Sequence, residues 1–211
     1  WKKNARILYL IIPLNKALRE IHFPEKISEI NLARERLSFD EIFNISLKGS
    51  LKRKTIRSKK TVVSVVPSKI SSFLDKLTSN LPYELTPSQK EVTKEILNDL
   101  SKSFPMNRLL QGEVGSGKTI IAVLASLAVV KSGKSSVILA PTEALAYQHY
   151  MTFKKLLEPL SVTVSLITGS SEKTELNSDV IIGTHALLYS NAPLKGGGLV
   201  VVDEQHKFGV A

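Results

Sequence analysis

The sequence predicts an α/β fold, in which a mostly parallel sheet is flanked by helices and preceded by a smaller, mainly helical segment. Short apolar runs alternate with helical patterns from residue 82 onward, which is typical of a parallel sheet covered on both faces. A glycine-rich loop joins a predicted strand to a predicted helix at residues 112–119. The charge balance also changes along the chain. Residues 1–80 hold 17 of the 29 Lys and Arg and 7 of the 19 Asp and Glu, whereas residues 81–211 are neutral. We therefore expect two parts, 1–80 and 81–211.

The first part is expected to be helical and basic. Apolar residues at three- and four-residue intervals predict helices between Pro13 and Leu47, interrupted at Pro24. A basic stretch with no acidic residue runs from Lys48 to Lys60, and a valine-rich piece and a helix at 68–79 follow. Such a stretch favours the binding of a polyanion such as nucleic acid. A solvated or disordered connector explains it equally well.

The second part opens with helix-start signals. Thr86 is a capping residue, Pro87 suits the first helical position, and Gln89 stands where a capping box requires it. Further helices are expected at 117–131, apolar nearly all round and so buried, and at 143–157. The expected strands are 108–111, 137–140, 162–167, 180–182 and 199–202.

Composition excludes two classes of protein. The chain has no cysteine, so it has neither a disulfide framework nor a cysteine-based metal site. Its apolar runs are shorter than the roughly 18 residues that span a bilayer, so we expect no membrane association.

The glycine-rich loop has the spacing of a phosphate-binding loop, G-x-x-x-x-G-K-[ST], between a strand and a helix. Backbone N–H groups and the helix N-terminus attract phosphate oxygens. Lys118 would reach the β- and γ-phosphates, and the hydroxyl of Thr119 would hold Mg²⁺. The predicted nucleotide-binding residues are Gly112, Glu113, Val114, Gly115, Ser116, Gly117, Lys118 and Thr119.

A second motif, Asp203-Glu204-Gln205-His206, follows the apolar run 199–202. Adjacent carboxylates at the end of a buried strand need a cation to offset their repulsion. Asp203 would bind Mg²⁺ through water, and Glu204 would polarise the attacking water. Gln205 and His206 would face the γ-phosphate and complete the predicted catalytic set. Gln89 has two interpretations, as a capping residue or as a reader of adenine.

These motifs and the segments 85–89, 140–143 and 183–187 resemble the ordered motif set of superfamily 2 helicases. The longer strings at 105–111, 148–150 and 203–210 narrow the resemblance to the RecG family of bacterial ATP-dependent DNA helicases that remodel branched DNA. It covers nearly the whole chain. It implies a RecA-like lobe at 81–211, which uses ATP and Mg²⁺, and a connecting segment at 1–80 between wedge domain and motor.

The resemblance also implies roles and partners. Gln89 becomes the adenine reader, and segments after the strands contact the DNA backbone, through Thr142, Glu143, Thr168, Gly169, Ser170, Thr184 and His185. The partners implied are branched double-stranded DNA, a wedge domain before Trp1 and a second RecA-like lobe after Ala211. Both ends of the sequence look like cuts in a longer protein. We expect a cytoplasmic bacterial monomer, and a segment that alone binds ATP weakly and barely hydrolyses it.

The sequence departs from the family pattern in places. Glu113 replaces the usual Asp and Lys207 the usual Arg, while the connection from Thr168 to Asp179 is short. Two alternatives stay open: the motor lobe of a transcription-repair coupling factor, and a non-catalytic nucleic-acid-binding module with a vestigial nucleotide fold. Intact Lys118 and Asp203 argue against the second.

Overall fold

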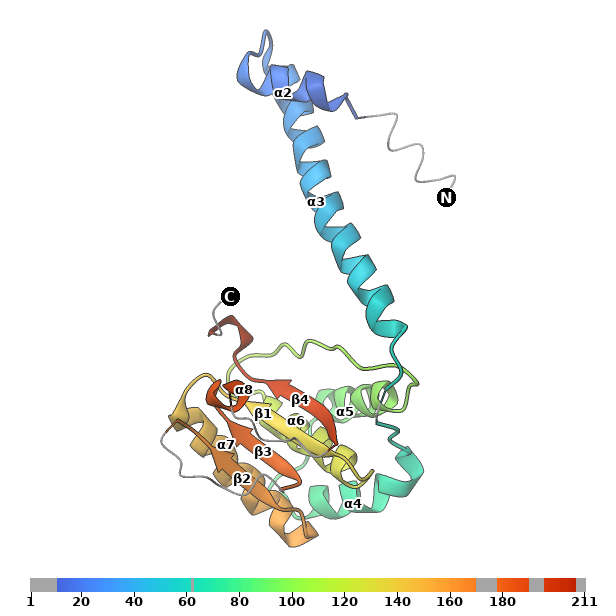
Figure 1. Ribbon diagram of the computed structural model, residues 1–211, viewed down its shortest axis with the longest axis vertical. Helices are drawn as coiled ribbons and strands as arrows, with labels where there is room; N and C mark the ends of the chain where they lie inside the picture. The colour runs from blue at the N-terminus through green and yellow to red at the C-terminus, as the bar shows by residue number, and fades with distance from the viewer. Residues whose placement is uncertain (1–10, 62, 170–177, 190–195, 208–211) are drawn as a thin grey trace. The chain divides into compact units, whose positions relative to one another are not determined.

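The computed structural model describes residues 11–61, 63–169, 178–189 and 196–207 (Figure 1). The chain divides into two compact units, Trp1–Ser58 and Lys59–Ala211. Ser170 lies outside the described residues, as does most of the connection between Thr168 and Asp179.

Over residues 11–58, the first unit contains two packed helices, α2 (Leu14–His22) and α3 (Ile27–Arg57). Ala17 on α2 and Ala33 on α3 are fully buried, because small side chains let two helices approach closely. The predicted interruption at Pro24 is confirmed. Glu29 stabilises the start of α3, since its Oε2 accepts from the backbone N–H groups of Glu25 at 3.1 Å and Lys26 at 3.2 Å.

The basic stretch is more ordered than a disordered connector. Helix α3 continues through Lys48, Lys52, Arg53 and Lys54 to Arg57. Lys and Arg are good helix formers, and positive charge is favourable near a helix C-terminus. The cations from Lys48 to Arg57 therefore project from a solvent-exposed helix.

The second unit is built on a four-stranded parallel sheet in the order β2-β3-β1-β4. The strands are β1 (Ser135–Leu139), β2 (Val164–Ile167), β3 (Val180–Gly183) and β4 (Gly197–Val202). Their helices are α4 (Pro67–Ser79), α5 (Pro87–Leu100), α6 (Lys118–Val130), α7 (Glu143–Leu157) and the short α8 (Ala186–Tyr189), with 3₁₀ turns at Glu158–Leu160 and Gln205–Lys207. The predicted α/β class with a parallel sheet is confirmed (Figure 1).

The core lies between the sheet and its helices. Helix α6 packs on β1 and β4, while α7 packs on β2 and β3 (Figure 1). Ile138 of β1 is paired with Ile182 of β3 and with Val201 of β4. Leu124 and Leu127 of α6 are almost completely buried against this layer, as the all-round apolar pattern predicts.

The second unit begins earlier than the predicted boundary at residue 80. Val63, Val65, Ile70 and Leu77 are buried in the same core as α6, so the valine-rich piece and α4 belong to this unit. Alternate valines point inward, and the backbone N–H of Val65 bonds to the carbonyl of Leu100 at 3.4 Å. The division into a connecting segment and a motor domain at residues 80 and 81 stays a prediction.

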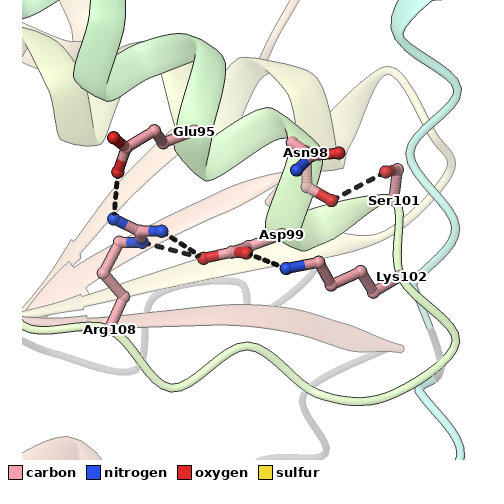
Figure 2. Close-up of polar contacts among 6 residues, drawn as sticks. All are labelled: Glu95, Asn98, Asp99, Ser101, Lys102 and Arg108. Atoms are coloured by element: carbon pink, nitrogen blue, oxygen red, sulfur yellow. Dashed lines mark hydrogen bonds and ion pairs between the residues drawn. The ribbon is translucent and has the colours of Figure 1, made fainter.

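The prediction of a strand at 108–111 is wrong for the described structure. Residues 105–113 have no regular secondary structure. Leu109 is exposed, and the side chain of Arg108 bonds to α5 rather than facing a neighbouring strand (Figure 2). An apolar run forms a strand only where a partner supplies ladder bonds, and sequence periodicity does not reveal the partner.

The glycine run at 196–198 has a packing explanation. A Cβ atom on Gly198 would lie 2.7 Å from side-chain atoms of Lys134, Val129 and Val63. At Gly198 the start of β4 therefore approaches α6 and the valine-rich piece more closely than any side chain permits.

Candidate nucleotide-binding site

The phosphate loop leads into α6 through two left-handed residues. Gly115 and Gly117 both have φ of 82°, a conformation that costs glycine little. Helix α6 begins at Lys118, directly after Gly117. The residues 111–116 are exposed, whereas Lys118 and Thr119 are half-buried. The loop therefore presents its backbone to solvent at a helix N-terminus, which is the arrangement that binds phosphate.

The ammonium group of Lys118 lies over this loop. Its Nζ donates to the carbonyl of Gly112 at 2.8 Å and to that of Glu113 at 2.9 Å. These bonds hold the positive charge on the side of the loop where phosphate oxygens would gather.

Gln89 contacts two segments at once. The side-chain Oε1 of Gln89 accepts from the backbone N–H of Thr86 at 2.9 Å, and the backbone N–H of Gln89 donates to the Thr86 hydroxyl at 3.2 Å. The predicted capping box is thus present. The Nε2 of Gln89 also donates to the carbonyl of Ser116 at 2.9 Å. The N-terminus of α5 is therefore tied to the phosphate loop, while adenine recognition by Gln89 stays a prediction.

The other end of α5 holds the segment that precedes the loop (Figure 2). Arg108 bonds to Asp99 through Nε at 2.8 Å and through a terminal nitrogen at 2.7 Å, and to Glu95 at 2.5 Å. Lys102 is a second cation on Asp99. Burial raises the pKa of Asp99, but hydrogen bonds from Lys102 and Arg108 and their charges outweigh it and leave the pKa below its usual value. Hydrogen bonding to Asp99 raises the pKa of Arg108 against the effect of burial.

Asp203 and Glu204 stand at the carboxyl end of β4, as predicted. The expectation that this strand is buried is wrong for the described residues, because β4 lies at the edge of the sheet and Val200 and Val202 are 58% and 42% exposed. The N–H of Asp203 donates to the carbonyl of Leu139 at 2.9 Å and extends the ladder with β1. The chain turns at Glu204, whose φ is 48° and whose N–H donates to Oδ1 of Asp203 at 3.0 Å. Gln205 is exposed in the 3₁₀ turn, and the side chain of His206 is not described.

Sequence reasoning missed one residue of this site. Nε2 of His149, on α7, lies 2.8 Å from Oδ2 of Asp203. Because the two residues are 54 positions apart, no local pattern links them. The string 148–150 marks His149 only as part of a family resemblance.

The oxygen donors of the site suit Mg²⁺. No group of three or more His, Cys, Asp or Glu that could hold a metal occurs among the described residues. Mg²⁺ needs no such cluster, because it usually combines one or two carboxylates with phosphate oxygens and water. The Thr119 hydroxyl and the Asp203 carboxylate are hard ligands of this kind.

The predicted DNA contacts lie along the same edge of the sheet. Thr142, Thr168 and Thr184 follow β1, β2 and β3, and carboxyl ends of parallel strands share an edge. The Thr142 hydroxyl caps α7 by accepting from Leu145 N–H at 3.3 Å. Thr184 is only 4% exposed, so its side chain does not face solvent.

Two of the predicted contacts are neighbours in space. A Cβ on Gly169 would lie 3.4 Å from Oε1 of Glu143, so these segments meet although they follow different strands. His185 is exposed. DNA binding by any of these residues stays a prediction.

Comparisons with known proteins agree with this architecture. The family model of the DEAD/DEAH box helicases matches residues 86–211. The chain is 44% identical over 209 residues to the ATP-dependent DNA helicase RecG of Aquifex aeolicus. That alignment covers 92% of this chain and 26% of the Aquifex protein. It is 39% identical over 212 residues to RecG of Borreliella burgdorferi, which covers 96% of this chain and 30% of that protein.

A solved structure of RecG bound to a three-way DNA junction superposes with a TM-score of 0.80 at 34% identity, over 98% of this chain and 30% of that one. This chain therefore belongs to the DEAD/DEAH box helicase family, and use of ATP follows from that membership. The predicted resemblance to RecG is confirmed over nearly the whole chain. The chain spans about a third or less of these relatives' length.

Among the described residues, no helix is both long enough and apolar enough to cross a bilayer.

Proposed function

We propose that this chain is the ATP-binding part of an ATP-dependent DNA translocase that remodels branched DNA, such as stalled replication forks and Holliday junctions. The observation that carries the proposal is the likeness to RecG, which has been solved on a three-way DNA junction, together with a phosphate loop and an acidic strand end on one parallel sheet.

Each residue of the site then has a role. The loop 112–119 cradles the phosphates, and Lys118 neutralises charge on the β- and γ-oxygens. Thr119 and Asp203 would hold Mg²⁺, Asp203 through water, and the ion would supply positive charge to the phosphate oxygens. Glu204 orients and deprotonates the attacking water.

The remaining polar residues link nucleotide and DNA. Gln205 and His206 face the γ-phosphate and couple it to DNA contact or to a partner lobe. DNA backbone contacts come from the carboxyl ends of β1, β2 and β3, through the segments around Thr142, Thr168 and Thr184. Such contacts position a duplex without reading its sequence.

The activity requires parts beyond this chain. The second RecA-like lobe would supply a cation to the transferring phosphoryl group, a contribution of about 10³–10⁵ in rate. The wedge domain would grip the branch. We place the protein in the bacterial cytoplasm as a monomer, since it resembles bacterial DNA helicases. The 211-residue chain alone is expected to bind nucleotide weakly and to show no DNA-stimulated turnover.

The test uses the full-length protein that carries this chain. ATP hydrolysis and unwinding are measured with three-way junctions and with linear duplex of the same length. Lys118→Ala is expected to abolish junction-stimulated hydrolysis, whereas Lys94→Ala, an exposed lysine on α5, retains it. Full activity of the Lys118→Ala protein would contradict the enzyme assignment. Equal stimulation by both DNAs would contradict the preference for branches.

A further inference from the structure

The contact between His149 and Asp203 joins two elements of the second unit. His149 lies on α7, and Asp203 follows β4 at the end of the sheet. The side chain of His149 is 12% exposed and that of Asp203 is 28% exposed. The pair is therefore partly shielded from water, and a hydrogen bond there is stronger than one on the open surface.

The chemistry of the two groups determines the direction of the bond. A carboxylate has no proton to donate, so Nε2 of His149 carries the hydrogen and Oδ2 of Asp203 accepts it at 2.8 Å. Oδ1 of Asp203 accepts from the N–H of Glu204 at 3.0 Å. Each oxygen thus has one fixed donor, which prevents rotation of the carboxylate and leaves a lone pair on each oxygen for a further ligand.

We propose that His149 is a positioning residue of the metal site, which holds the Asp203 carboxylate in the orientation that binds the hydrated Mg²⁺ of a nucleotide. The inference rests on the proposed function, in which Asp203 serves the metal. Removing a group that orients a direct metal ligand costs about 10–100-fold in metal affinity. Because Asp203 would reach the ion through water, we expect the effect of His149 at the lower end of that range.

The position of α7 makes this support rigid. Ala146, Phe153 and Leu157 of α7 are fully buried, so His149 projects from a helix anchored in the core on both sides. Asp203, in contrast, stands where the chain leaves the sheet and turns at Glu204. The histidine thus connects a site residue at a turn to a fixed element.

A purely structural role predicts something different. A partly exposed hydrogen-bonded pair contributes modestly to stability. If that were its only role, removing His149 would lower the unfolding temperature and would weaken nucleotide binding equally with and without Mg²⁺. The positioning role predicts a weakening confined to the Mg²⁺-bound nucleotide.

The experiment measures nucleotide binding, without hydrolysis, by the full-length protein that carries this chain. The Kd of a fluorescent ADP analogue is determined by anisotropy in Mg²⁺ and in EDTA, and bound Mn²⁺ is counted by electron paramagnetic resonance. The variants are His149→Ala, His149→Gln, Asp203→Asn and His22→Ala, the last being an exposed histidine on α2. Circular dichroism checks that each variant is folded.

The expected effect is selective. In His149→Ala the Kd for Mg²⁺·ADP rises about 10-fold and Mn²⁺ binding weakens similarly, while the Kd in EDTA changes less than about 2-fold. His149→Gln, whose amide donates from a similar place, restores the Kd in Mg²⁺ to within about 3-fold of the original. His22→Ala binds like the original chain.

Three outcomes would overturn the inference: an unchanged Kd in His149→Ala, an equal weakening in Mg²⁺ and EDTA, or no rescue by His149→Gln. If Asp203→Asn removes the advantage of Mg²⁺ while His149→Ala does not, the inference alone fails and the proposed site remains. If the original chain binds ADP equally well in Mg²⁺ and EDTA, the metal site of the proposed function fails, and the inference with it.

Discussion

Replacing Arg108 by Gln tests how firmly α5 holds the segment before the phosphate loop. The change removes the cation from a cluster in which Arg108 is 31% exposed and Asp99 is 17% exposed. Asp99 keeps Lys102 as a partner, so it is not left buried without a cation. Glu95 is 51% exposed and is little affected when its bond to Arg108 is removed.

The magnitude follows from these exposures. Removing one partner from a hydrogen bond to a charged group costs about 1.5–3 kcal/mol when the group is buried. Solvent screening of this partly exposed cluster reduces that to about 1–2 kcal/mol. For a domain of this size, each kcal/mol lowers the unfolding temperature by roughly 2–4 °C, so a total decrease of about 2–8 °C is expected.

The pH dependence gives a second check. The pKa of Asp99 in the folded chain is below its ordinary value of 3.8. A depressed pKa means that its contribution to stability is full above the unfolded pKa and disappears as the pH falls through the folded one. The difference in stability between the original chain and Arg108→Gln is therefore expected to be constant near pH 7 and to shrink below about pH 4.

Thermal unfolding followed by circular dichroism measures both effects. Lys94→Gln is the matched control, because it removes one cation from an exposed site on α5, the helix to which Arg108 bonds. It is expected to change the unfolding temperature by about 1 °C or less. A double-mutant cycle with Asp99→Asn isolates the pair. An unfolding temperature of Arg108→Gln that equals that of Lys94→Gln at pH 7, or a difference that widens in acid, would refute the reasoning.

Three further changes test other parts of the chain. Gly198→Ala is expected to destabilise by about 1–3 kcal/mol in urea unfolding, because its Cβ would overlap Val129 and Val63; equal stability would show that this packing is loose. Gln89→Ala removes the capping box and the bond to Ser116, which is expected to lower the free energy of unfolding by about 1–2 kcal/mol and to weaken nucleotide binding. Unchanged nucleotide binding would show that the bond from α5 does not position the phosphate loop. Replacing Lys52, Arg53 and Lys54 by Gln is expected to reduce the slope of log affinity for DNA against log salt concentration by about one for each phosphate that is no longer neutralised. An unchanged slope would show that the basic end of α3 does not bind DNA and serves only as a connector.

Features determined by neighbouring residues could be predicted from the sequence. The cap at Thr86 and the limits of α7 at 143–157 are as expected, because their signals lie within one or two turns. The phosphate loop could also be predicted from the sequence, since its glycines and its lysine lie within a single short segment. Periodicity also identified four of the five expected strands, with ends shifted by one or two residues.

Features that depend on distant partners could not be predicted. The sequence predicts a strand at 108–111, but the segment has no regular secondary structure, and Arg108 bonds to Asp99 and Glu95 of α5. The valine-rich piece joins the core of α6 rather than the first part, because Val63 and Val65 face a surface that only the folded unit creates. The bond from His149 to Asp203 crosses 54 positions, and nothing in either local pattern indicates it.

The two halves of the proposed nucleotide site are positioned by different helices. The phosphate loop is held by α5, through Gln89 within the capping box and Arg108 before the loop. Asp203 is held by α7 through His149 and by β1 through the ladder bond to Leu139. A Mg²⁺-bound nucleotide that contacts both Thr119 and Asp203 would therefore link the α5–α6 side to the α7–β4 side. Helix α7 also begins next to Thr142, one of the predicted DNA contacts, so the helix that bonds to Asp203 extends to that edge of the sheet.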